Sequence, residues 1–212
     1  MGDLIYILFV SVFVPILLMA GLIEKKSRQP ITFVLIGIFV SVFAAEVNGL
    51  LRNVLPMDIF EITIIVTPIT EEILKAVPIL VYATALSAKK EKLFTAAMAV
   101  GIGFAVLENA FYLLNDASFG MIDAVIRAFG AGLMHGMCTL LVGVGISFAK
   151  KRSKIFVVGT FALLSTAITY HGIYNMLVQS DFEVVGFLLP MATYIPFFIW
   201  RIKNLRKKQQ QK

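Results

Sequence analysis

The sequence has little of what a soluble protein needs at its surface. Only 15% of its 212 residues are charged, against about 25% in a typical soluble domain, whereas 59% are hydrophobic. A single cysteine, Cys138, excludes an intramolecular disulfide, and only two histidines, His135 and His171, are present. No connection between the apolar runs is long enough to hold a soluble domain. Any chemistry is therefore confined to a lipid bilayer or to its surface.

Long apolar runs make up most of the chain instead. A hydrocarbon layer about 30 Å thick needs about 20 helical residues to cross it. Runs near that length occur at 4–23, 31–51, 60–86, 93–114, 122–148, 155–178 and 184–200. The sequence thus predicts an all-α, polytopic transmembrane helical bundle with about seven spans, in which residues 1–212 form a single integral-membrane domain.

Positive charge is concentrated in alternate connections. All but three of the 19 basic residues follow the first, third, fifth or seventh run, the exceptions being Arg52, Lys75 and Arg127. Lysine and arginine accumulate on the cytoplasmic side of membrane proteins, so the N-terminus is predicted outside and the C-terminus cytoplasmic. Residues 201–212 then form a basic cytoplasmic tail. The net charge of +6 could suggest nucleic-acid binding, but the positions of the basic residues indicate a multi-pass protein of the cell membrane, whose partner is the lipid bilayer and not nucleic acid.

Ionisable side chains nevertheless occur inside the runs, where each charge costs about 2.5–3.5 kcal/mol on insertion scales. In five runs, one such residue lies 15 to 18 residues from the nearest cytoplasmic basic residue. That separation is about 22–27 Å at 1.5 Å per helical residue. The five residues are Glu46, Glu72, Glu108, His135 and His171. A common depth predicts one shared site in the outer half of the membrane, although Glu46 could equally form an interhelical hydrogen bond.

The predicted catalytic residues are Glu71, Glu72, Glu108, His135, His171 and Asn175. Lys75 lies one helical turn from the two adjacent glutamates and is expected to neutralise them. Phe104 is expected to pack against the site, and Asn109 to satisfy neighbouring polar groups. These three residues are therefore assigned to structural support.

Several kinds of chemistry suit this set. A carboxylate can act as general base on water while His171 and Asn175, on one helix face, donate hydrogen bonds to an oxyanion. Alternatively, Glu108, His135 and His171 could bind a divalent metal such as zinc, with one glutamate of the 71–72 pair as base. We favour the metal-free version, because the chain has two histidines and no H-E-x-x-H motif. A proton or ion path in a transporter would use the same residue types.

Four short motifs, in order along the chain, resemble those of the PrsW-type intramembrane proteases. They are Glu71 to Lys75 (E-E-x-x-K), Gly103 to Asn109 with Tyr112 (G-F-x-x-x-E-N), Arg127 with His135 and Gly136, and His171 to Asn175 (H-G-x-Y-D). The last motif departs from the family pattern, because asparagine stands at 175 where aspartate is expected. The related CAAX prenyl proteases and bacteriocin-processing or immunity proteins carry histidine where this chain has Glu108.

The resemblance implies a membrane-embedded endopeptidase that hydrolyses a peptide bond of a membrane-anchored substrate. Such proteases make the first, outward-facing cut in a single-span anti-sigma factor in a stress response, so an anti-sigma factor is the expected partner. The resemblance also assigns Arg127 to structural support. The first alternative is a CAAX-prenyl-protease-like or bacteriocin-immunity protease, and the second is an ion- or proton-coupled transporter.

Overall fold

The computed structural model describes residues 2–22, 25–86, 89–115, 121–148 and 153–210, and its regular structure is entirely helical. The helices are α1 (Gly2–Leu22), α2 (Lys25–Val54), α3 (Ile59–Glu61), α4 (Thr67–Ala85), α5 (Lys90–Asn115), α6 (Met121–Ile146), α7 (Ser153–Val178) and α8 (Glu183–Gln210). A π-helical turn, η1 (Ile62–Val66), joins α3 to α4. The predicted all-α bundle is confirmed, and each predicted run coincides with a helix or with the α3–η1–α4 segment to within one or two residues at its C-terminal end.

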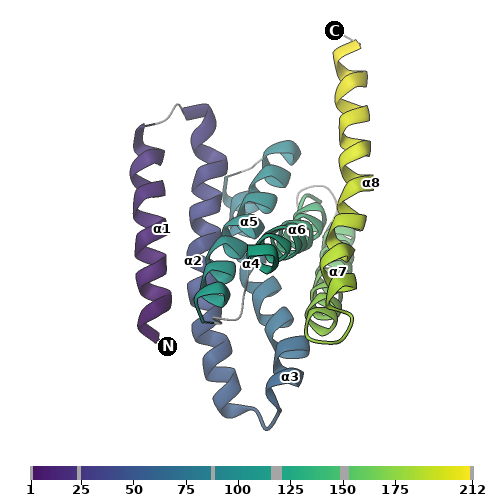
Figure 1. Cartoon of the computed structure of the whole chain (residues 1–212). Coiled ribbons are helices and arrows are strands. Elements are labelled where there is room, and N and C mark those ends of the chain that lie inside the picture. Colours follow the sequence, from purple (N-terminus) through teal and green to yellow (C-terminus); the bar gives the residue numbers. More distant parts are fainter. Residues whose placement is uncertain (1, 23–24, 87–88, 116–120, 149–152, 211–212) are drawn as a thin grey trace.

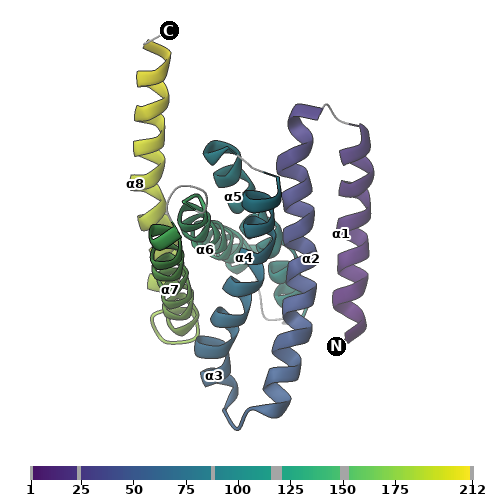
Figure 2. The same ribbon diagram turned by 180° about the vertical axis from the view of Figure 1, so that it is seen from behind.

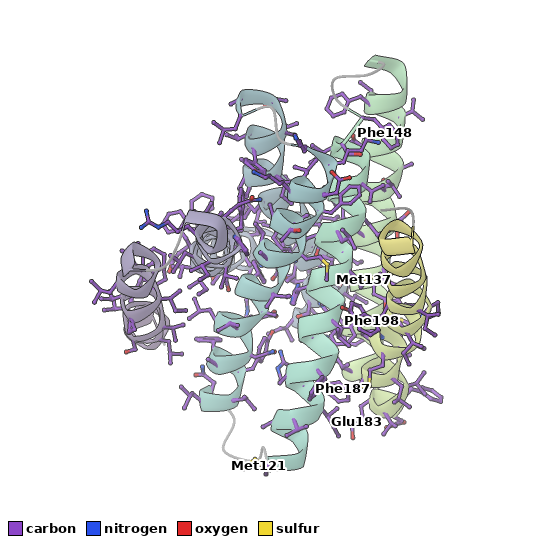
Figure 3. The ribbon with its side chains drawn as sticks, turned by 90° about the horizontal axis from the view of Figure 1, so that it is seen from above. Met121, Met137, Phe148, Glu183, Phe187 and Phe198 are labelled. Carbon is purple, nitrogen blue, oxygen red and sulfur yellow. The ribbon has the colours of Figure 1, made fainter. Side chains whose placement is uncertain are left out.

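The bundle is built around α4, which contacts α2, α5, α6 and α7. α1 and α8 lie at its two sides (Figure 1 and Figure 2). Seen from above, α1 and α2 occupy one side and α8, marked by Glu183, Phe187 and Phe198, the other (Figure 3). Within the described residues, α2, α5, α6 and α7 each contain a stretch long and apolar enough to cross a membrane.

α4 is polar towards the bundle and apolar on the outside. Its buried residues recur every three or four positions and are Pro68, Glu71, Glu72, Lys75, Ile79 and Ala83. Ile69, Ile73 and Val77, on the opposite face, are exposed. A helix in water shows the reverse pattern, whereas charged residues of membrane helices face the bundle interior. The lipid environment therefore accounts for the gathering of charge along the centre of the bundle.

Two glycines allow α2 and α5 to approach closely. A Cβ atom on Gly37 would collide with the carbonyl oxygen of Val100, and a Cβ on Gly103 would collide with that of Val34. Gly132 of α6, whose spacing from Gly136 also suggests close packing, has open space where its Cβ would lie. The contact between α2 and α5 is therefore one of the close contacts that hold the site in place, and Gly101 of α5 makes another with the carbonyl of His135 in α6.

α1 begins and α8 ends at opposite ends of the bundle, as an odd number of passes requires (Figure 1). The connection from α2 to α3 lies at the end where α1 begins (Figure 1). The predicted outer connection at Asp116 and the predicted inner one at residues 150–152 lie outside the described residues. The side of the membrane that each end faces, and the count of seven spans, remain predictions.

Candidate active site

A buried ion pair within α4 lies at the centre of the site. Glu72 and Lys75 are three residues apart and completely buried, and Lys75 Nζ donates a hydrogen bond to Glu72 Oε1 at 2.6 Å. Each charge offsets part of the desolvation cost of the other. Lys75 Nζ also lies 4.4 Å from the centre of the Phe104 ring, where a cation is attracted to the aromatic face.

The same carboxylate orients His171 of α7. His171 Nδ1 lies 2.9 Å from Glu72 Oε1, and because an ionised carboxylate only accepts hydrogen bonds, Nδ1 carries the proton. The other ring nitrogen, Nε2, lies 3.9 Å from Glu71 Oε2. Glu72 therefore holds Lys75 and directs the free nitrogen of His171 towards Glu71.

His135 of α6 has a partner at each ring nitrogen. Lys75 Nζ lies 2.8 Å from His135 Nδ1, which accepts because an ammonium group only donates. Nε2 then carries the proton and donates to Glu108 Oε2 at 2.6 Å. The His135 ring is 4.9 Å from that of His171 and 5.0 Å from that of Phe104, centre to centre. His135 thus connects the central ion pair to Glu108 of α5.

Glu71 differs from Glu72 because it faces a cavity of about 410 Å³. Asn48 Nδ2 donates to Glu71 Oε1 at 3.4 Å, and the other oxygen, Oε2, is buried without a hydrogen-bond partner. The cavity also borders Glu108 and extends to Arg52, near the end of α2. A buried carboxylate oxygen without a partner, beside a cavity that also borders Asn48, Arg52 and Glu108, is a suitable place for a reacting water.

Asn175 bonds to a different part of the molecule. It follows His171 by one helical turn, and its Nδ2 donates to the main-chain carbonyl oxygen of Thr63, in η1, at 3.0 Å. No residue pattern selects Thr63 in advance, because the atom involved is a main-chain oxygen and does not depend on the type of side chain. Pro68 was the one indication in the sequence that a carbonyl in the preceding turn lacks its main-chain donor, because proline has no N–H group.

The other predicted residues lie around this cluster or away from it. Glu46 is on the exposed side of α2 and accepts a hydrogen bond from Tyr6 of α1 at 2.7 Å, so it joins two helices and is not part of the cluster. Arg127 stacks on Tyr112, with its guanidinium carbon 3.9 Å from the ring centre. Asn109 is buried, and its side-chain oxygen has no hydrogen-bond partner.

Three residues of the cluster are of the types that could hold a divalent metal. One ligand atom from each of Glu71, His135 and His171 lies within 4.8 Å of the others. The predicted ligand set contained Glu108, which instead contacts His135 Nε2. Lys75 and Glu108 engage both ring nitrogens of His135 in this structure, so His135 would bind a metal ion only in place of one of these contacts.

Comparison with known proteins assigns the chain to a family. No curated protein and no solved structure matches it significantly. The family model described as PrsW family intramembrane metalloprotease matches residues 26–201, which include all four motifs and exclude α1. The match selects the protease among the functions that the sequence left open. As predicted, the chain is a multi-pass membrane protease, and it belongs to the PrsW family of intramembrane metalloproteases.

Proposed function

We propose that this protease cuts a single-span anti-sigma factor near the outer face of the membrane, with Glu71 as general base. The observation that carries the assignment of the base is the position of Glu71 Oε2, buried without a partner on a residue that lines the 410 Å³ cavity. Glu72 Oε2 is also buried without a partner, but Glu72 does not line the cavity, and its Oε1 binds both Lys75 and His171. The two adjacent glutamates therefore have different roles.

The proposed reaction uses the gap between Glu71 and His171. Glu71 Oε2 and His171 Nε2, 3.9 Å apart, can both bond to one oxygen atom about 2.8 Å from each. Glu71 takes a proton from a water molecule held there, and the water oxygen bonds to the scissile carbonyl carbon. This step requires a second proton on His171, taken up from solvent at Nε2, and Nε2 then donates a hydrogen bond to the carbonyl oxygen as that oxygen gains charge. Glu71 then passes its proton to the leaving amine as the C–N bond breaks.

The remaining charged groups orient this pair. Glu72 fixes the ring of His171, while Lys75 and Glu108 fix the ring of His135 that packs against it. Asn175 was expected to be a second oxyanion donor. It has no part in this step of the proposal, because its amide nitrogen bonds to Thr63.

The shape of the cavity supports an outward-facing cut. Its lining includes Arg52 at the end of α2, Ile59 at the start of α3 and Asn115 at the end of α5. These helix ends belong to the side predicted to lie outside the cell. A membrane-anchored chain could therefore reach Glu71 from the outer surface. The anti-sigma factor as substrate rests on the family resemblance.

Cleavage by the purified protein in lipid vesicles, measured with tagged single-span anti-sigma factors, tests the proposal. We expect Glu71→Gln to lower kcat by about 10²–10⁴-fold, as loss of a general base does. Glu46→Gln is the matched control, because Glu46 has a similar predicted depth but lies outside the cluster. Wild-type rates for Glu71→Gln would overturn the assignment of the base. Cleavage of other single-span proteins but not of anti-sigma factors would overturn only the assignment of the substrate and would leave that of the base intact.

Metal analysis of the same preparation tests the metal-free version. We expect activity to persist in protein that contains no stoichiometric transition metal. One equivalent of zinc, lost together with activity on chelation and restored on its return, would contradict that expectation. Glu71, His135 and His171 would then be the residues to test as ligands.

A further inference from the structure

The turn before α4 leaves one main-chain carbonyl without a partner in its own helix. In η1 the N–H group of Thr67 bonds to the carbonyl of Ile62, five residues earlier. Continued by one residue, this pattern would pair residue 68 with the carbonyl of Thr63. Residue 68 is proline, which has no N–H group and whose ring disfavours regular α-helix before it. Pro68 thus accounts both for the widened turn and for the free carbonyl of Thr63.

α7 supplies the missing donor. Asn175 Nδ2 donates to Thr63 O at 3.0 Å. Three residues earlier in α7, Gly172 lies so close to η1 that a Cβ atom on it would be 2.7 Å from the carbonyl oxygen of Ile64. Two consecutive carbonyls of η1 therefore face α7 at a point where α7 offers one residue without a side chain and one amide donor.

This contact lies beside the catalytic groups on both helices. On α7, His171 directly precedes Gly172 and contacts Glu72 and Glu71. On the other side, the Pro68 that follows η1 lies one helical turn before Glu71 and Glu72. A shift of α7 along η1 would therefore move His171 Nε2 relative to Glu71 Oε2.

We propose that Asn175 is a positioning residue, which locks α7 onto the carbonyl freed by Pro68 and so sets the alignment of His171 with Glu71. The assignment rests on the proposed role of His171 as oxyanion donor. It also gives a reason for asparagine at a position where the family motif has aspartate. An amide can donate to a carbonyl oxygen, whereas an ionised carboxylate only accepts.

The test is a double-mutant cycle with Pro68→Ala, because alanine restores the N–H group that Thr63 lacks. We expect Asn175→Ala to lower kcat about ten-fold or more, with KM little changed. The carbonyl of Thr63 loses its hydrogen-bond donor, and His171 Nε2 is then misplaced relative to the oxyanion in the transition state. In the Pro68→Ala background the same substitution should cost less than about three-fold. An equal loss in both backgrounds, or a lower unfolding temperature with unchanged kcat, would overturn the proposal.

Two further variants sharpen the result. Asn175→Asp should behave like Asn175→Ala, and a variant as active as the wild type would count against the proposal. Gln179→Leu is the matched control, because its amide bonds to the carbonyl of Asn175 within α7 and does not reach η1. Thermal unfolding of the four proteins in the cycle needs no substrate and should show a coupling of the same sign. Absence of that coupling would refute the helix lock even if the protease chemistry holds.

Discussion

Glu71 and Glu72 are adjacent in sequence but differ in their surroundings. Consecutive residues of an α-helix point about 100° apart, so one carboxylate can face the cavity while the other faces the helices behind it. Each of the two carboxylates has one buried oxygen without a hydrogen-bond partner, but Glu72 binds an ammonium and an imidazole through its other oxygen, whereas Glu71 lines the cavity. Glu72 therefore organises its neighbours away from the cavity, and Glu71 is the carboxylate that a reactant in the cavity can reach.

Lys75 is expected to be essential for stability. Lys75→Met keeps the aliphatic length but leaves Glu72 and His135 without their buried cation. Removing one partner of a buried ion pair typically costs about 3–5 kcal/mol, because the other charge stays uncompensated. The unfolding temperature in detergent should fall well below that of Lys89→Met, an exposed lysine outside the site. Adding Glu72→Gln to Lys75→Met should recover part of the lost stability. Equal stability of Lys75→Met and Lys89→Met would contradict this account.

The helices hold the site through main-chain contacts as well as through charges. α5 carries Glu108 and Phe104, and it approaches α2 so closely at Gly37 and Gly103 that no Cβ atom fits. Such packing is typical of membrane helices, because lipid tails provide no hydrophobic driving force between helices and close contact must replace it. The position of Glu108 therefore depends on a glycine that has no polar group.

Gly103→Ala should be destabilising by about 1–3 kcal/mol, the usual cost of overpacking, because the added methyl meets the carbonyl of Val34. Cleavage activity should fall as well, since α5 must shift to accept it. Gly132→Ala is the control, because open space surrounds its Cβ position. The test compares the unfolding temperature and the cleavage rate of Gly103→Ala with those of Gly132→Ala. Comparable behaviour would mean that the α2–α5 contact is less tight than described.

At the scale of the molecule, sequence reasoning worked where the signal is local. Apolar length and basic residues at the ends of the runs predicted a helical bundle, and depth along each helix predicted where ionisable groups lie. Depth leaves the rotation of a helix about its own axis undetermined. Glu46 and Glu72 were placed at similar depths, yet Glu46 faces Tyr6 of α1 and Glu72 faces His171. The role of Thr63 could not be predicted, because it depends on a contact between its main-chain oxygen and another helix, which no pattern of side chains in the sequence indicates.

The orientation of the whole bundle can be tested with single cysteines in a Cys138→Ala background. Asp181 and Lys89 are both exposed and lie in connections predicted to face opposite sides of the membrane. We expect an impermeant thiol reagent added to intact cells to label Asp181→Cys but not Lys89→Cys. Labelling at position 89 alone would invert the predicted topology and place the mouth of the cavity in the cytoplasm.

The cavity should be the route by which substrate reaches Glu71. Gly49 lines it, has open space at its Cβ position and bears no catalytic group. Gly49→Phe would place a ring in the cavity without disturbing helix packing, so kcat/KM should fall about ten-fold or more, a loss of about 1.4 kcal/mol in transition-state binding. The unfolding temperature should change little. Gly159→Phe, which also enters open space but lies on α7 away from the cavity, should cleave normally. Unchanged kcat/KM for Gly49→Phe would mean that substrate enters between other helices, and the outward-facing cut would then lose its structural support.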